Sequence, residues 1–366
     1  MNPQIDNIFL DNDTLQFTLQ NVDVSIANTL RRTILSDIEL CVFKTYPYEE
    51  CEASIEINTT RLNNEILKQR LSCIPIHITD PDFPIENFIL TLDEENTTNI
   101  MKYVTTEDFK LYDVVTKSYM PQKEVENIFP KNSITNQFID FVRLRPRISG
   151  DIPGEKIKLT CKISKASAKQ DYMFNVACAS CYGFTQDKDK VDEEWNIKEK
   201  ELSKNEDMSK QDIEYIKNDW YNLDAKRIFL KNSYDFTVQT VGIFTCYELV
   251  KKSCKIIYDS LETFKNETVQ INVSDTNIDN SFDIILFEKD HTFGKCLEYL
   301  LYTKFYEEQS TLSYIGYQKQ HPHDDYSIIR IAYKQEVDKE VIVKDIKSAC
   351  DDGIILFKEI EQLFIE

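Results

Sequence analysis

Cysteine and histidine are the side chains of this sequence that could bind a metal ion or carry out nucleophilic chemistry. The 366 residues include ten cysteines, of which Cys178 and Cys181 alone have the C-x-x-C spacing of a zinc half-site or a redox pair. No second pair and no histidine lies near them, and no helix N-terminus that would lower a thiol pKa is expected there. We therefore predict two buried cysteines of a strand, and keep a thiol oxidoreductase that uses Cys178 and Cys181 as an alternative.

Three of the four histidines lie toward the end of the sequence. His291 stands between Asp290 and Thr292 at the expected start of a helix, where these two neighbours can accept hydrogen bonds from free N–H groups. His321 and His323 flank a proline, which favours a loop. No further ligands gather near these histidines, so we expect His291 to be structural. The sequence thus predicts no metal site, no cofactor and no catalytic residue.

Charge and composition narrow the classes of partner. Asp and Glu number 63 against 43 Lys and Arg, which gives a net charge of −20 at pH 7. Contact with a nucleic-acid backbone needs clustered cations, so we expect protein partners and little or no direct nucleic-acid contact. Only 7 glycines occur, without a glycine-rich motif, which excludes a phosphate-binding loop. No run of about 18 apolar residues is present, so no membrane contact is expected.

The other cysteines are scattered singly, mostly among apolar residues. Such cysteines are typical of small core residues in a reducing compartment. The sequence also lacks an apolar signal segment near its first residue. We therefore expect an intracellular protein.

The stretch 21–37 organises the first half of the chain. Before it, Leu15 and Phe17 alternate with polar residues and predict a strand over 14–18. Ser25 is expected to cap a helix, in which apolar residues recur at helical spacing. Those apolar positions are Ile26, Ala27, Leu30, Ile34, Leu35 and Ile38. The predicted unit is a strand, a tight connection and an amphipathic helix.

Residue identities in and after this unit resemble a known family signature. The helix contains the pattern N-x-L-R-R at 28–32, and an Asn-Thr-Thr triplet follows at 58–60. The residues that match the next segment of the family are Glu65, Arg70, Leu71, Ile74 and Pro75. In order and spacing these segments are similar to α-like RNA polymerase subunits. That family includes the bacterial α subunit, the archaeal D subunit and the third-largest subunit of RNA polymerase II.

The resemblance implies a mainly β domain inserted at 46–231. In many relatives this domain carries a cysteine cluster for zinc or an iron–sulfur centre, whereas here no cysteine lies between Cys73 and Cys161. A structural zinc site needs about four nitrogen or sulfur ligands, so we expect a metal-free insert held together by packing and hydrogen bonds. Within it, 186–219 is rich in charge and predicts an exposed insertion with a helix that begins near Ser209.

The second half of the chain repeats the order of elements. We expect an apolar strand at 282–287, a helix, two strands near 312–319 and 326–334, and a last helix. Apolar or small residues at 346, 350, 353, 357, 360 and 364 give the last helix a spacing typical of helix–helix packing. The sequence D-H-T-F-G at 290–294 resembles the D-H-T-L-G signature of the small α-like subunits, namely the archaeal L subunit and the eleventh-largest subunit of RNA polymerase II.

The repeated order of elements and the two signatures predict an α+β fold. We expect two α-like dimerisation domains, each with a sheet and long packed helices, related by a pseudo-twofold axis. The large-half domain would comprise 1–45 and 232–264, and the small-half domain 281–366, with a linker at 265–280.

The resemblance implies that the chain fuses the large and small α-like subunits. It would then be a non-catalytic assembly platform, an intramolecular α-like heterodimer present once per DNA-directed RNA polymerase. In the family the two largest subunits dock on this platform and carry the catalytic Mg²⁺, and small polymerase subunits bind the large half. An α-like adaptor that dimerises outside a polymerase is the alternative.

The resemblance also implies subunit-interface residues. Guanidinium groups suit carboxylates and carbonyls at an interface, although each arginine of the first signature could instead brace its own domain. The residues expected to contact or support the second-largest subunit are Asn28, Arg31, Arg32, Glu65 and Arg70. The residues expected to set the matching helix start, on the side of the largest subunit, are Asp290, His291, Thr292 and Gly294.

Cellular organisms generally make the two subunits as separate chains, whereas the fused form resembles the arrangement in large DNA viruses. We therefore expect a viral RNA polymerase subunit of the nucleocytoplasmic large DNA virus type. Its location would be the virus factory, the host cytoplasm or the host nucleus, and packaging in the virion stays open.

Overall fold

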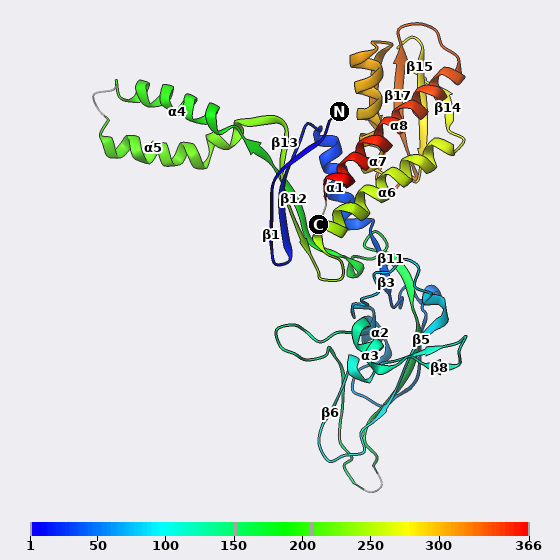
Figure 1. The fold of residues 1–366 in the computed structure, drawn as a ribbon. Coiled ribbons are helices and arrows are strands. Elements are labelled where there is room, and N and C mark those ends of the chain that lie inside the picture. The colour runs from blue at the N-terminus through cyan, green and yellow to red at the C-terminus, as the bar shows by residue number, and fades with distance from the viewer. Residues whose placement is uncertain (1, 150–151, 205–207, 365–366) are drawn as a thin grey trace. The chain divides into compact units, whose positions relative to one another are not determined.

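The computed structural model describes residues 2–149, 152–204 and 208–364. The chain forms two compact units (Figure 1). The first unit comprises 1–35, 177–240 and 246–366, and the second comprises 36–176 and 241–245. Both units mix helices and strands, as the α+β prediction requires.

One antiparallel sheet of the first unit contains strands from the beginning and the middle of the chain. Its order is β1 (Gln4–Asp11), β2 (Thr14–Gln20), β13 (Phe229–Thr240) and β12 (Ala177–Gln186). Alternation in β2 buries Leu15, Phe17 and Leu19 on one face of this sheet. Phe17 lies opposite Phe236 of β13, and their rings stack 5.0 Å apart.

Two helices of the first unit each follow a strand of this sheet in the sequence. Helix α1 (Val24–Ser36) follows β2 and buries the apolar face that its spacing predicts. Its cap is Asp23 and not Ser25, because the Asp23 carboxylate accepts from Ser25 N at 2.8 Å. The Asp23 carbonyl also accepts from Ile26 N, so the helix begins two residues earlier than the Ser25 prediction requires. Helix α6 (Cys246–Asn266) follows β13 and has a longer apolar face.

A second antiparallel sheet of the first unit is built from the end of the chain. Its order is β14 (Gln270–Val273), β15 (Ser281–Phe287), β17 (Tyr326–Tyr333) and β16 (Leu312–Gln318). Helix α7 (His291–Leu301) follows β15 and continues into a wide π turn, Tyr302–Glu308. Helix α8 (Lys339–Leu363) follows β17. The expected strands and helices of the second half are therefore confirmed.

Helices from both halves of the chain share the core of the first unit. Helix α8 packs along α6 and also contacts α7. A Cβ added at Gly353 of α8 would lie 2.7 Å from Leu300 of α7 and 2.8 Å from Leu261 of α6, so the glycine permits this close approach. The positions of the expected packing spacing are all buried, namely Ile346, Cys350, Gly353, Phe357 and Ile360 of α8 and Phe364 directly after it.

The compact units divide the chain at positions other than those expected for an insert at 46–231. Strand β12 pairs with β13 from Ala177 to Gln186, which assigns this part of the expected insert to the sheet of the first unit. The second unit therefore comprises 36–176 and the short segment 241–245, instead of the whole of 46–231. The expected linker at 265–280 is shorter too, because α6 extends to Asn266 and β14 occupies Gln270–Val273.

A pair of helices connects β12 to β13. Helix α4 (Lys188–Leu202) was not anticipated, whereas α5 (Lys210–Asn222) has the predicted cap at Ser209. Trp195 of α4 is 2% exposed and packs on Trp220 and Tyr221 of α5. The charged segment 186–219 is thus mainly a helical pair with a small aromatic contact, and its residues 205–207 lie outside the described residues.

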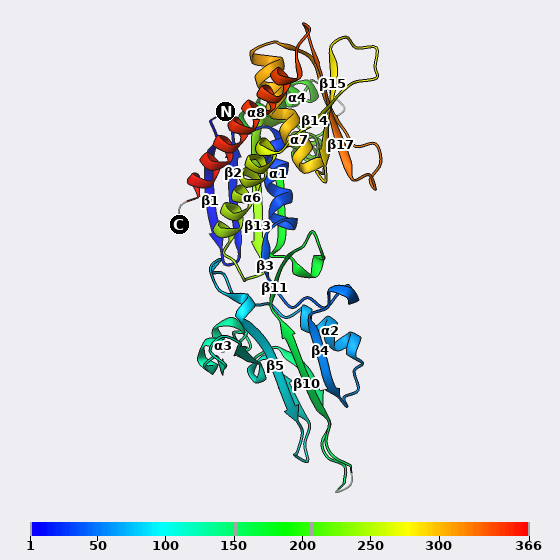
Figure 2. The ribbon, with the colours of Figure 1, turned by 90° about the vertical axis from the view of Figure 1, so that its right-hand side faces the viewer.

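The second unit is mainly β (Figure 2). Its largest sheet has the order β4 (Ala53–Asn58), β10 (Lys156–Lys162), β5 (Phe88–Glu95), β7 (Lys110–Asp113) and β8 (Ser118–Tyr119). Two further pairs are β3 (Glu39–Val42) with β11 (Ser164–Ser167), and β6 (Lys102–Thr105) with β9 (Asp140–Leu144). Helices α2 (Asn64–Ser72) and α3 (Gln122–Ile128) complete the unit. Its core contains the packed rings of Phe43, Phe109, Phe129 and Phe141.

Within the described residues, no group of three or more His, Cys, Asp or Glu side chains is placed to hold a metal ion. In the same residues, every helix is too short or too polar to cross a membrane.

Candidate functional site

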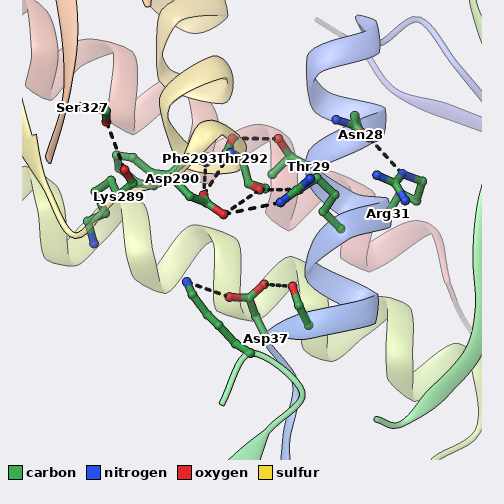
Figure 3. Close-up of polar contacts among 12 residues, drawn as sticks. Asn28, Thr29, Arg31, Asp37, Lys289, Asp290, Thr292, Phe293 and Ser327 are labelled. Atoms are coloured by element: carbon green, nitrogen blue, oxygen red, sulfur yellow. Dashed lines mark hydrogen bonds and ion pairs between the residues drawn. The ribbon is translucent and has the colours of Figure 1, made fainter. Parts of the chain in front are cut away.

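The second signature lies at the start of helix α7. The carboxylate of Asp290 caps this helix by accepting from Thr292 N at 3.0 Å and Phe293 N at 3.3 Å (Figure 3). It also accepts from the Thr292 hydroxyl at 3.1 Å. A carboxylate is favoured at this position by the free N–H groups and by the helix dipole. The predicted capping role of Asp290 is confirmed.

Strand β17 and the residue before it hold the segment that precedes α7 in place. Ser327 of β17 is 1% exposed and donates from its hydroxyl to the Lys289 carbonyl at 3.0 Å (Figure 3). Glu288 N donates to the Asp325 carbonyl at 2.7 Å. The start of α7 is therefore held in place by contacts with β17 and with the residue before that strand.

Helix α1 meets the start of α7 through the first signature. Arg32 Nε donates to the Thr292 hydroxyl at 2.8 Å, and Arg32 Nη2 lies 3.7 Å from Asp290 Oδ2. The Thr29 hydroxyl shares its hydrogen between the Ser25 carbonyl at 2.8 Å and the Thr292 carbonyl at 3.3 Å; Figure 3 shows the contact with Thr292. We call this contact the α1–α7 junction. In it, the stretch 28–32 contacts the stretch 290–294 within a single chain.

The other two predicted residues of α1 contact each other. Arg31 Nε donates to Asn28 Oδ1 at 2.9 Å, one helical turn away (Figure 3). Arg31 forms no ion pair with the residues that the structure describes. It lies near Tyr182 of β12, where burial raises the pKa of the phenol and the Arg31 charge opposes that rise. The charge of Arg31 is thus available to a partner, whereas Arg32 is engaged in the junction.

A shallow depression of about 190 Å³ lies along the junction. Its lining comes from α1, α7 and β12, and consists of Val24, Ser25, Asn28, Thr29, Arg32, Tyr182, His291, Thr292 and Lys295. Cationic groups, hydroxyls and an amide here suit carboxylate and carbonyl oxygens of another protein.

Gly294 and His291 of α7 lie against the ring of Tyr317 from β16. A Cβ on Gly294 would lie 1.9 Å from a carbon of the Tyr317 ring, so a side chain cannot be added without moving the ring. The His291 ring packs edge-on against Tyr317 at 5.2 Å, and Lys295 Nζ lies 5.7 Å from its centre. His291 is exposed, and its structural role stays a prediction.

Glu65 and Arg70 belong to helix α2 of the second unit. Asn63 caps this helix by accepting from Ile66 N, and Glu65 is exposed in its first turn. Arg70 Nε donates to the Phe141 carbonyl at 2.7 Å, and Nη2 donates to the Asp140 carbonyl at 2.6 Å. Arg70 therefore binds backbone oxygens of β9.

The prediction that Cys178 and Cys181 are buried is wrong. Both are exposed on β12, and their thiols lie 3.7 and 3.8 Å from the carbonyls of Thr240 and Thr237. The β12–β13 register shifts between Ala177 and Ala179, so Cys178 occupies a bulge that the sequence pattern does not reveal. Six other cysteines are buried as expected, namely Cys41, Cys161, Cys246, Cys254, Cys296 and Cys350. Burial raises the pKa of Cys296 and of Cys350 to about 12.

Sequence reasoning missed Thr29, Tyr182, Lys295 and Tyr317 at this site. Thr29 stands inside the first signature, and its position one turn from Arg32 was the available signal. Lys295 follows the second signature directly. Tyr182 and Tyr317 come from strands, and nothing in their local sequence indicates which helix they meet.

The fold and the junction define an α+β protein in which helices from both halves of the chain pack together in the first unit. A model of the RNA polymerase Rpb3/Rpb11 dimerisation domain matches residues 16–261, more than half of the sequence. The chain belongs to this family.

Three relatives show what the chain is similar to. It is 24% identical over 194 residues to DNA-directed RNA polymerase II subunit rpb3 of Dictyostelium discoideum, covering 50% of this chain and 58% of that protein. It is 21% identical over 313 residues to the subunit RPAC1 of RNA polymerases I and III of Homo sapiens, covering 73% and 84%. The third is the protein of Acanthamoeba polyphaga mimivirus named "Putative DNA directed RNA polymerase subunit R470", 29% identical over 133 residues and covering 36% of this chain and 35% of that protein. The match thus spans less than two thirds of two of these relatives.

Proposed function

We propose that this chain is a non-catalytic assembly platform of a DNA-directed RNA polymerase, in which both α-like partners are parts of one polypeptide. The observation that carries the proposal is the α1–α7 junction. Arg32 of the large-subunit signature binds Thr292 and Asp290 of the small-subunit signature. The described residues hold no metal-binding cluster, and the relatives are subunits of RNA polymerases.

A heterodimer within the chain is supported by contacts along the helices as well as at the junction. Phe264 of α6 packs on Phe293 of α7 with ring centres 5.1 Å apart. Lys265 of α6 forms an ion pair with Asp351 of α8 at 2.6 Å. The order strand, helix, strands, long helix occurs in both halves, which supports a pseudo-twofold relation between them. Fusion keeps the halves at high effective concentration, so their pairing does not depend on subunit levels.

The two largest polymerase subunits would dock on the exposed sides of the junction. Asn28 and Arg31 form the candidate contact for the second-largest subunit, because the Arg31 charge is unpaired within the described chain. His291 and Lys295 line the depression on the α7 side, the candidate side for the largest subunit. Small polymerase subunits would bind the large half, and one copy would serve each polymerase.

A viral polymerase is the proposed setting. The mimivirus relative and the fused order of the two signatures support it. The chain would then act in the virus factory, the host cytoplasm or the host nucleus.

The test is affinity purification of the tagged chain from its native source, with mass spectrometry and an RNA synthesis assay of the eluate. We expect two very large chains in equal amounts with the tagged chain, and RNA synthesis without a promoter. Recovery with other partners and without the large chains would overturn the polymerase role and favour the adaptor alternative.

Variants of the two neighbouring arginines separate docking from internal support. We expect Arg31→Ala to leave a folded chain that recovers less of the second-largest subunit, and Arg32→Ala to act mainly through stability. The matched control is Arg227→Ala, whose side chain is 85% exposed. Normal recovery of the second-largest subunit by the Arg31→Ala and Arg32→Ala double variant would contradict the docking surface.

A further inference from the structure

Four arginines gather around one hollow of the second unit. The chain contains nine arginines within a net charge of −20. Arg61, Arg70, Arg143 and Arg145 line a hollow of about 340 Å³, together with Asp140 and with apolar side chains that include Met101 and Phe141. We call it the arginine hollow. So dense a group of cations on an acidic chain requires a specific explanation.

The walls of the arginine hollow are held in place by buried groups. Arg145 forms an ion pair with Glu155, which is 7% exposed and also accepts from Arg145 N at 2.7 Å. Asn96 is fully buried and donates to the carbonyls of Ile100 and Leu144, each at 2.8 Å. These bonds fix the segment before Met101 and the end of β9. This part of the wall is preformed, so a ligand would not have to order it.

The charges of the four arginines are not equally compensated. Arg143 pairs with Asp140 at 3.2 Å, and Arg145 pairs with Glu155. Arg70 donates only to two backbone carbonyls, which are neutral. Arg61 is exposed and forms no hydrogen bond or ion pair with any residue described. Two guanidinium charges therefore remain for an anionic ligand.

Both uncompensated guanidinium groups retain donors. A guanidinium group has five N–H donors in a planar fork, and Arg70 commits only Nε and Nη2 to carbonyls. The remaining donors suit carboxylates, which arginine binds through parallel charge-assisted hydrogen bonds.

The apolar part of the hollow decides the class of ligand. Met101 is 45% exposed, and nearby Ile100 and Tyr103 are 73% and 54% exposed. Apolar side chains beside two free charges match a peptide that carries both carboxylates and an apolar residue. A nucleic-acid strand is disfavoured, because a net charge of −20 repels a polyanion and two free cations release few counterions.

We propose that the arginine hollow binds an acidic peptide segment of a partner protein. Two carboxylates would lie against Arg61 and Arg70, and an apolar side chain would lie over Met101 and Phe141. This inference goes beyond the proposed function, since it assigns a ligand chemistry to the second unit and holds whether or not the partner belongs to a polymerase.

The experiment selects peptides from a displayed library of random twelve-residue sequences on the full chain. We expect enrichment of sequences in which Asp or Glu flanks Leu, Phe or Trp. The affinity of the most enriched peptide is then measured by fluorescence anisotropy at low and high salt. Binding should weaken as salt rises, because partly exposed ion pairs are screened.

Three variants locate the bound peptide. Arg61→Glu should weaken binding by about tenfold or more, because it replaces an attractive charge by a repulsive one. Met101→Glu should weaken it as well, through the apolar contact. Arg227→Glu, an equal charge change in the first unit, should alter binding by less than about twofold. Unchanged thermal unfolding shows that each variant is folded.

Several results would contradict the binding of an acidic peptide. Enriched peptides without acidic residues, no enrichment at all, or equal binding to Arg61→Glu would overturn the proposal. A twelve-nucleotide thymidine oligomer and inorganic phosphate serve as competitors. If the oligomer binds more tightly than the peptide and loses affinity in Arg61→Glu, the hollow is a nucleic-acid site and the proposal is wrong.

Discussion

The α1–α7 junction and the arginine hollow both depend on arginine, but they use the guanidinium group differently. In the junction, Arg32 binds a hydroxyl and lies beside the carboxylate of Asp290 within the chain. In the hollow, Arg70 binds neutral carbonyls and Arg61 binds no described residue. An arginine paired with a carboxylate of its own chain contributes to the fold. An arginine that is unpaired, or bound only to carbonyls, keeps its charge for a partner.

The largest loss of stability should come from the core that α6, α7 and α8 share. Phe357 of α8 is fully buried, so Phe357→Ala removes a ring from the core that both halves share. We expect it to lower the free energy of unfolding by about 3–5 kcal/mol. Calorimetry of the full chain should show an earlier transition for the first unit. Phe141→Ala in the second unit is the matched control, and equal shifts of all transitions in both variants would contradict separate units.

A bidentate ion pair in the second half is the clearest case of an arginine paired with a carboxylate of its own chain. Arg330 donates to Asp283 through Nε at 2.6 Å and Nη2 at 2.8 Å. The hydrogen bonds from Arg330 hold the pKa of the Asp283 carboxyl below its usual value. Charge-assisted bonds of this type contribute about 1.5–3 kcal/mol. We therefore expect Asp283→Asn to be less stable than the wild type at pH 7.

The pH dependence of the stability difference between wild type and Asp283→Asn tests whether the charge of Asp283 causes that difference. A carboxyl whose pKa is lowered in the folded state contributes fully above its unfolded pKa, which is about 3.9, and less as pH falls through the folded value. Urea unfolding should therefore give a stability gap between wild type and Asp283→Asn that is constant above about pH 5 and shrinks toward pH 3. A gap that does not change with pH would show that the charge of Asp283 is not the cause.

The close approach of Tyr317 to α7 predicts a smaller loss of stability for Gly294→Ala. In Gly294→Ala, the added methyl group meets the Tyr317 ring, and overpacking of this kind costs about 1–3 kcal/mol. The higher helix propensity of alanine offsets about 1 kcal/mol of that cost. Tyr317→Ser should relieve the clash, so the double variant should lose less stability than the two single losses added together. Additive losses in urea unfolding would argue against the contact.

The sequence predicts elements whose signals are local. Helix α7 and its Asp290 cap follow from a capping residue before an apolar stripe. The cap of α1 was misplaced because Asp23 and Ser25 both suit this position, and only the path of the chain decides between them. Strand β1 was missed, since Ile8, Phe9 and Leu10 are consecutive exposed apolar residues without alternation.

The sites depend on contacts that are distant in sequence. The arginine hollow joins Arg61 and Arg70 to arginines more than 70 positions later. The alternation R-L-R-P-R at 143–147 was its only local signal. The junction was easier to anticipate because each signature marks its own helix start. That Arg32 and Thr292 would bind each other follows only from the packing of the two halves.

The smallest expected changes in stability are those of Arg32→Ala and Arg61→Ala. Arg32→Ala removes the hydrogen bond to Thr292 and a partly exposed ion pair with Asp290, which together contribute about 1 kcal/mol. Arg61→Ala removes no contact within the described chain and should change stability by less than about 0.5 kcal/mol. Urea unfolding at low salt measures both. A stability loss for Arg61→Ala as large as that for Arg32→Ala would mean that Arg61 supports the fold, and its charge would then not be free for a partner.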